Sequence, residues 1–122
     1  MSSLKNLETL AAPEEKLSRA AKKAIKIIQS FMMRHDFQTG GCKTFYSPSS
    51  WKERDEKYGR DSELLVVYDG GDLYYVMNPH YADFPSLFYK YEAELMRELE
   101  EEGLSLEPCT HWYCAIYRSE DR

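Results

Sequence analysis

One stretch, residues 62–78, constrains the fold more than any other part of this chain. Its first half contains Leu-Leu-Val-Val at 64–67, and four consecutive apolar residues are typical of a strand that is covered on both faces. Its second half, residues 73–77, alternates in side-chain character and predicts another strand. The Asp-Gly-Gly-Asp link at 69–72 supplies glycines for the positive φ angles of a tight turn. The sequence therefore predicts a hairpin within a sheet.

Two amphipathic helices are expected, one on each side of this hairpin. The first spans residues 13–34, because Pro13 suits the first helical position and the apolar side chains that follow share one face. The second spans residues 85–102, where Pro85 favours the start of a helix and Gly103 its end. The apolar stripe of the first helix consists of Leu17, Ala20, Ala21, Ala24, Ile25, Ile27, Ile28, Phe31 and Met32.

Two further strands complete the prediction, at residues 42–46 and 109–118. The order along the chain is then α-β-β-β-α-β. This order indicates an α+β fold, with an antiparallel sheet of about four strands. We expect both helices to pack on one face of the sheet, so that the other face is open.

A chain of 122 residues has the size of one domain. We expect this single α+β domain to span residues 13–122, after a loosely ordered arm at residues 1–12. No apolar run approaches the roughly 20 residues that cross a bilayer, and the N-terminus lacks the pattern of a secretory signal. The three cysteines are an odd number in a chain that does not need disulfides, which indicates reduced thiols and a cytoplasmic protein.

Charge is distributed unevenly along the chain. Residues 1–62 carry a net charge of +4 and residues 63–122 carry −9, which together give −5. The asymmetry indicates either a charged partner or two halves that face each other. Cations form one face of the first helix, and this face is either solvated or an electrostatic contact for phosphate or an acidic partner. The candidate contact consists of Arg19, Lys22, Lys23 and Lys26.

Ten tyrosines in 122 residues are the strongest anomaly of the composition. Tyrosine is amphipathic and is enriched where proteins contact partners. A long polar connection at residues 47–61 carries Trp51, which is either an anchor that holds this loop on the core or a hot spot for a partner. The open face of the sheet is expected to present the remaining partner-binding side chains. These are Tyr74, His111, Tyr113 and Tyr117.

No set of residues predicts catalysis, a cofactor or a metal site. Cys109 and Cys114 point to opposite faces of a strand, which argues against a shared tetrahedral zinc ion. A thiol nucleophile at Cys109 beside His111 lacks an identifiable orienting acid. Glu92 lies inside the apolar stripe of the second helix, either as a buried base with a raised pKa or as an edge residue. One acid-base candidate remains near the turns, where such residues are also ordinary: His80, Asp69, Asp72 and Asp83.

The leading interpretation is a small non-enzymatic protein-binding module of the adaptor or inhibitor type. It would use the aromatic sheet face and the Trp51 loop, and it would form a homodimer. The first alternative is an acidic nucleic-acid mimic, because glutamates concentrate at residues 94–102, although the cationic first helix counts against it. The second alternative is a small enzyme or ligand-binding domain with a pocket between sheet and loop. The scarcity of Lys and Arg after residue 63 disfavours nucleic-acid binding, and we expect no membrane contact.

Overall fold

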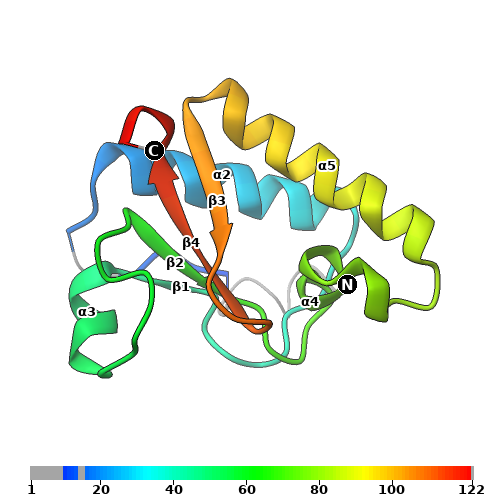
Figure 1. The fold of residues 1–122 in the computed structure, drawn as a ribbon, viewed down its shortest axis with the longest axis horizontal. Helices are drawn as coiled ribbons and strands as arrows, with labels where there is room; N and C mark the ends of the chain where they lie inside the picture. The colour runs from blue at the N-terminus through cyan, green and yellow to red at the C-terminus, as the bar shows by residue number, and fades with distance from the viewer. Residues whose placement is uncertain (1–9, 14–15, 122) are drawn as a thin grey trace.

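The computed structural model describes residues 10–13 and 16–121, and it contains a four-stranded antiparallel sheet with strand order β1-β2-β4-β3 (Figure 1). This confirms the predicted α+β class and the antiparallel sheet. The strands are β1 (Phe45–Tyr46), β2 (Leu64–Val67), β3 (Leu104–Pro108) and β4 (Tyr113–Arg118). The helices are α2 (Arg19–Arg34), α3 (Pro48–Glu53), α4 (Leu73–Met77) and α5 (Pro85–Glu101), with 3-10 turns η1 (Pro79–Tyr81) and η2 (Ser119–Asp121).

Strand β2 lies inside the sheet, with β1 on one side and β4 on the other. All of its residues are buried. Leu64 and Val66 belong to the core beneath α2 and α5, whereas Leu65 and Val67 belong to a second cluster on the opposite face. The prediction of an inner strand that is covered on both faces is therefore confirmed.

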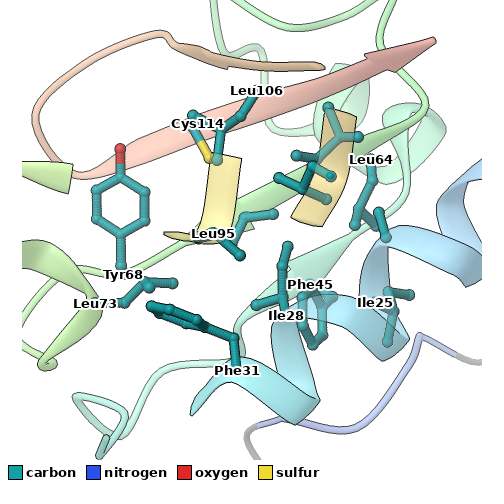
Figure 2. Close-up of a cluster of buried hydrophobic side chains, with 14 of the residues drawn as sticks. Ile25, Ile28, Phe31, Phe45, Leu64, Tyr68, Leu73, Leu95, Leu106 and Cys114 are labelled. Atoms are coloured by element: carbon teal, nitrogen blue, oxygen red, sulfur yellow. The ribbon is translucent and has the colours of Figure 1, made fainter. Parts of the chain in front are cut away.

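The main core lies between one face of the sheet and the helices α2 and α5. Figure 2 shows Ile25, Ile28 and Phe31 of α2 in the same cluster as Leu95 of α5 and Cys114 of β4. Burial of each large apolar side chain of this kind stabilises a fold by roughly 1.5–3 kcal/mol. The predicted placement of both long helices on one face is confirmed.

Helix α2 begins later than the sequence predicts. The backbone at residues 16–18 is not helical, and Ser18 is the N-cap. Its hydroxyl oxygen accepts a hydrogen bond from the backbone N–H of Ala21 at 3.1 Å, which satisfies one of the free donors of the first turn. The predicted start at Pro13 is therefore wrong, because a better capping residue follows it.

The expected N-terminal arm is only partly within the described residues. Residues 1–9 lie outside them, and so do residues 14–15, which were predicted to belong to the first helix. Leu10 is 1% exposed and packs in the main core. The side chain of Gln29 in α2 donates a hydrogen bond to the carbonyl of Leu10 at 2.7 Å. This end of the arm is therefore attached to α2 by both an apolar and a polar contact.

The face of the sheet that was expected to be open is covered by α3 and the connection that follows it. Trp51 of α3 packs against Leu65 and Val67 of β2. Its indole Nε1 donates a hydrogen bond to the carbonyl of Tyr58 at 3.2 Å, which attaches the connection to the same cluster. The prediction of an open face is wrong, because the polar connection supplies its own apolar side chain to cover the sheet.

Residues 73–77 form helix α4 and not the predicted second strand of a hairpin. Leu73, Val76 and Met77 are buried, and this spacing of three and four residues is the period of a helix. Tyr75 points outward and is 40% exposed, whereas Tyr74 is half-buried. The hairpin prediction is therefore wrong, because five residues are too few to separate the two periods by pattern alone.

Strand β3 was not predicted from the sequence, and it completes the sheet in place of residues 73–77. Leu104 and Leu106 point into the main core, and Leu106 pairs with Ile116 of β4. The alternation of buried and exposed residues covers only five positions and ends at Pro108. Such a short signal beside a helix end is consistent with a connecting segment as well as with a strand.

Two glycine pairs bring the loop after α2 into backbone contact with the loop before α4. A Cβ atom at Gly40 would overlap the carbonyl of Asp69, and one at Gly71 would lie 2.8 Å from the carbonyl oxygen of Gln38. The N–H of Asp72 donates to that same carbonyl at 2.9 Å, and the Asp72 carboxylate accepts from the N–H of Gln38 at 2.7 Å. These contacts hold the start of α4 beside the loop that leaves α2.

Candidate functional site

Two of the predicted site residues, Trp51 and Tyr113, are buried beneath α3 and the connection after it. Trp51 is 0% exposed and Tyr113 is 1% exposed, and their ring centroids lie 4.9 Å apart. The hydroxyl of Tyr113 donates to the carbonyl of Tyr58 at 3.3 Å, and burial raises the pKa of this hydroxyl. Both side chains therefore hold the connection on the sheet, and neither presents surface to a partner in this conformation.

The border of this buried cluster is closed by the chain itself. The guanidinium of Arg54 lies 4.8 Å from the ring centroid of Trp51 and 5.2 Å from that of Tyr46. Tyr117 is half-buried at the border, and burial raises the pKa of its hydroxyl. These side chains occupy the space in which the sequence predicts a pocket between the sheet and the Trp51 loop.

A different group of aromatic side chains is exposed around α4, η1 and the start of α5. Phe84 is 71% exposed, Tyr81 is 60% exposed and Tyr75 is 40% exposed. Figure 1 shows α4 and the start of α5 at the end of the molecule opposite to α3. We call this group the aromatic surface, and we define it by Tyr74, Tyr75, Tyr81, Phe84, Phe88 and His111.

Ring contacts connect five members of the aromatic surface: Tyr74, Tyr75, Tyr81, Phe88 and His111. Tyr74 occupies the middle, with its ring centroid 5.3 Å from Tyr75, 6.3 Å from Tyr81 and 6.3 Å from His111. Tyr75 in turn lies 6.3 Å from Phe88 of α5 in an edge-to-face arrangement. The structure therefore brings together two of the predicted partner-binding residues, Tyr74 and His111, but it separates them from Trp51, Tyr113 and Tyr117.

Two hollows divide this surface, and Tyr75 forms the wall between them. The first hollow, of about 340 Å³, is bordered by Asp69, Tyr74, Tyr75 and His111 together with two glycines. The second hollow, of about 280 Å³, is bordered by aromatic rings and carboxylates. Its lining consists of Asp72, Tyr75, Tyr81, Ala82, Asp83, Phe84 and Phe88. Each hollow therefore combines aromatic faces with at least one carboxylate.

The fold positions the aromatic surface through α4 and the turn that follows it. The side-chain amide of Asn78 donates hydrogen bonds to the carbonyl of Tyr74 at 2.9 Å and to that of His111 at 2.8 Å. This amide joins the end of α4 to the loop before β4. Pro79 and Pro85 begin η1 and α5 on either side of the exposed Phe84.

Sequence reasoning missed four residues of this surface, Tyr75, Tyr81, Phe84 and Phe88. The available signal was the helical spacing of Leu73 and Val76, which would have placed Tyr75 on the outer side. Tyr81 and Phe84 lie between the predicted hairpin and the predicted second helix, in a segment for which the sequence predicts neither a helix nor a strand. Large apolar side chains in such an exposed turn are themselves an indication of contact with a partner.

The opposite charges of the two halves of the chain meet between α2 and α5. Arg34 forms ion pairs with Glu94 at 2.5 Å and Glu98 at 2.6 Å, and Lys23 lies 3.7 Å from Glu102. The hydrogen bond from His35 lowers the pKa of Glu94, and Arg34 lowers it further. Part of the charge asymmetry is therefore neutralised within the molecule, because basic residues of α2 pair with acidic residues of α5.

The predicted cationic contact on α2 is exposed along its whole length. Arg19, Lys22, Lys23 and Lys26 are all solvent-exposed, with Lys23 near Glu102. Arg19 and Lys23 also border another hollow, of about 530 Å³, at the start of α2. Opposite charges mix in this hollow, because its lining contains both basic and acidic side chains. These are Arg19, Lys23, Arg118, Glu63, Glu102 and Glu120. Ser18 also donates a hydrogen bond to Glu63 at 2.6 Å. Such a mixed lining selects no single ligand charge.

Comparison with known proteins gives no assignment. No protein-family model matches this chain, no curated protein is significantly similar to it, and no solved structure matches its fold.

The residues considered for catalysis lie at several separate places in the described structure. Burial raises the pKa of the Cys109 thiol, which disfavours the reactive thiolate. Burial also raises the pKa of Glu92, which borders none of the hollows described above. His80 stacks on Tyr81 with their ring centroids 4.1 Å apart.

Within residues 10–13 and 16–121, no group of three or more His, Cys, Asp or Glu side chains is placed to hold a metal ion. In that same part of the chain, no helix is both long enough and apolar enough to cross a membrane. The aromatic surface is thus the feature whose chemistry remains to be explained.

Proposed function

We propose that this chain is a non-enzymatic protein-binding module whose contact area is the aromatic surface. The observation that carries the proposal is the exposure of Tyr75, Tyr81 and Phe84, which border one hollow at α4, η1 and the start of α5. Aromatic side chains concentrate at protein interfaces because they bury a large area at a small cost in conformational entropy. An adaptor or inhibitor needs no more chemistry than this.

The sizes of the hollows support a protein partner over a small molecule. Pockets for drug-sized ligands and cofactors measure roughly 300–1,000 Å³ and enclose most of the ligand. The two hollows, of about 340 and 280 Å³, lie at or below the lower end of that range. They fit single side chains of a partner, which insert on either side of Tyr75.

Self-association through the aromatic surface is less favourable than binding to a different protein. A two-fold contact places the same patch of both copies face to face. Asp69 and Asp83 of one copy would then approach the same carboxylates of the other, and like charges across an interface cost free energy. We therefore assign the surface to a different partner and treat the predicted homodimer as an outcome of the test.

The other functions considered from the sequence have weaker support. Arg34 pairs with Glu94 and Glu98, which reduces the negative potential that a nucleic-acid mimic requires. The packing of Trp51 against Leu65 and Val67 fills the space between the sheet and the connection with the chain's own side chains, which disfavours an enzyme or ligand-binding domain with its pocket there. The three thiols are free, and this is consistent with the reducing environment of the cytoplasm.

Cross-linked capture from extracts of the source cells tests the proposal with a matched pair of variants. The double substitution Tyr75→Ser and Phe84→Ser removes exposed rings of the aromatic surface, whereas Leu87→Ser and Tyr89→Ser removes similar exposed area of α5 outside both hollows. We expect the first pair to reduce recovery of the partner at least about tenfold, because few residues carry most of the binding free energy. The second pair is expected to retain it.

Two results would overturn this proposal. One is equal recovery by the two double variants with unchanged circular dichroism spectra. The other is that the captured protein is a second copy of this chain, with light scattering showing a dimer that Tyr75→Ser and Phe84→Ser do not affect.

A further inference from the structure

We propose that the aromatic surface recognises a basic segment of its partner, and that each hollow takes one arginine side chain. This inference rests on the proposed function and names the chemistry of the partner. Each hollow offers a carboxylate beside aromatic faces. That combination matches a guanidinium, which accepts stacking on its flat sides and hydrogen-bonds carboxylates through its edge.

The first hollow presents this combination around Asp69. The ring of Tyr74 stands at 77° to that of Tyr75 and at 85° to that of His111, so that ring faces and edges meet at the hollow. Asp69 is exposed, and it forms no ion pair with any described residue. An incoming guanidinium would pair with this carboxylate and lie against the ring of Tyr75.

The second hollow repeats the combination with Asp83 and Asp72. Asp83 is exposed and, within the part of the chain that the structure describes, makes no ion pair. One oxygen of Asp72 accepts from the N–H of Gln38 at 2.7 Å, which fixes the orientation of this carboxylate at the border. Tyr81 and Phe84 supply the exposed ring area.

The borders of both hollows contain carboxylates without a compensating cation. Among the described residues, neither lining includes a lysine or an arginine. An apolar partner would take Asp69 and Asp83 out of water without pairing them, and this is costly. A basic partner pairs them, and the net charge of −9 on residues 63–122 favours its approach.

A guanidinium also lies against aromatic rings within the molecule itself, at the end of the fold that contains α3. There, the guanidinium of Arg54 lies 4.8 Å from the ring centroid of Trp51 and 5.2 Å from that of Tyr46, and it covers the border of the buried aromatic cluster. At the aromatic surface no such internal cation is present among the described residues. We infer that the partner supplies the equivalent arginine.

Labelled peptides with two arginines at a series of spacings are the probe, and fluorescence anisotropy with the intact chain is the measurement. We expect the arginine peptides to bind, the lysine versions to bind more weakly, and the neutral citrulline versions to bind at background. Binding of the arginine peptides should weaken as salt is raised, because exposed charges are screened. At least one spacing should bind better than the others, because the two hollows are at a fixed separation.

Matched variants locate the binding. Asp83→Asn and Tyr75→Leu each change one recognition group, and each is expected to weaken the arginine peptide by roughly two- to thirtyfold, the range of one cation–π contact or charged hydrogen bond. Glu101→Gln removes the same unit of charge from an exposed position outside both hollows and should change the affinity less than about twofold. Asp83→Asn and Glu101→Gln alter only exposed side chains, so they retain the fold.

The outcomes separate this inference from the proposed function. Equal binding of citrulline and arginine peptides, no binding of either, or an equal effect of Glu101→Gln and Asp83→Asn, refutes arginine recognition. If Tyr75→Ser with Phe84→Ser still abolishes partner capture in that case, the protein-binding proposal stands with an apolar partner. If that double variant captures the partner normally, the protein-binding proposal fails whatever the peptides do.

Discussion

At the scale of single residues, burial separates the aromatic side chains that stabilise the fold from those that are available for binding. Trp51 was open to both interpretations from the sequence, because a lone tryptophan in a polar connection fits an anchor and a hot spot equally. In the structure it is 0% exposed, and its indole N–H and the hydroxyl of Tyr113 converge on the carbonyl of Tyr58. Its contribution is therefore to stability.

Replacement of Trp51 tests this role directly. Trp51→Ala should lower the free energy of unfolding by about 3–5 kcal/mol, because it removes a large buried side chain and leaves a cavity. Urea denaturation followed by circular dichroism measures the change. Tyr58→Ala is the control, since the cluster uses the carbonyl of Tyr58 while its side chain is 47% exposed, and it should cost less than about 1 kcal/mol. Similar stabilities of the two variants would show that Trp51 is not an anchor.

The residues of the candidate site could be predicted only in part. Tyr74 and His111 lie together in the aromatic surface, but the sequence predicts them on an open sheet face, and that face is covered in the structure. Tyr113 and Tyr117 alternate along β4 and do share one face of the sheet, which is the face that Trp51 covers. Alternation shows which side chains share a face, but it does not show what covers that face.

At the scale of elements, long periodic segments were predictable and short ones were not. The stripe of α2 extends over four turns, and Pro85 with Gly103 marks both ends of α5, so both helices were identified. Helix α4 has five residues, and its helical state depends on burial of Leu73, Val76 and Met77 in a core built by distant segments. Tertiary contacts of this kind are not visible in a local pattern.

The contact between α2 and α5 predicts a pH-dependent contribution to stability. Since His35 and Arg34 lower the pKa of Glu94, its carboxylate stabilises the folded state above the ordinary glutamate pKa of about 4.3. This contribution is lost as the pH falls through the lowered pKa of the folded state. Glu94→Gln should therefore be less stable than the native chain near neutral pH, and the difference should shrink in acid.

Urea unfolding of both proteins at a series of pH values measures this difference. Glu101→Gln is the control, because Glu101 is exposed and forms none of the ion pairs between α2 and α5. Its stability difference from the native chain should stay small at every pH. A difference for Glu94→Gln that is constant with pH would show that the ion pairs do not contribute as described.

At the scale of the whole molecule, the acidic residues of the second half fall into two groups. Part of the acidic half pairs with the basic half through Arg34 and Lys23. The remainder includes Asp69 and Asp83, which border the aromatic surface. Net charge along the sequence could not distinguish the paired acids from the acids at the aromatic surface, because pairing depends on which segments the fold brings together.

The opposite ends of the molecule thus have different roles in this account. Around α3, aromatic rings are buried and the chain covers them with its own arginine. Around α4 and the start of α5, aromatic rings are exposed beside carboxylates (Figure 1). The central claim is that this second group is a binding surface for arginine side chains of another protein.

Nuclear magnetic resonance of the isotope-labelled chain, titrated with the best arginine peptide, tests that claim most directly. We predict that the largest amide shift changes occur at residues 69–75 and 81–88 and at His111, with none of comparable size along the exposed face of α2 or around Trp51. Shift changes that centre on Tyr117, on Arg54 or on Lys22 and Lys26 would contradict the claim.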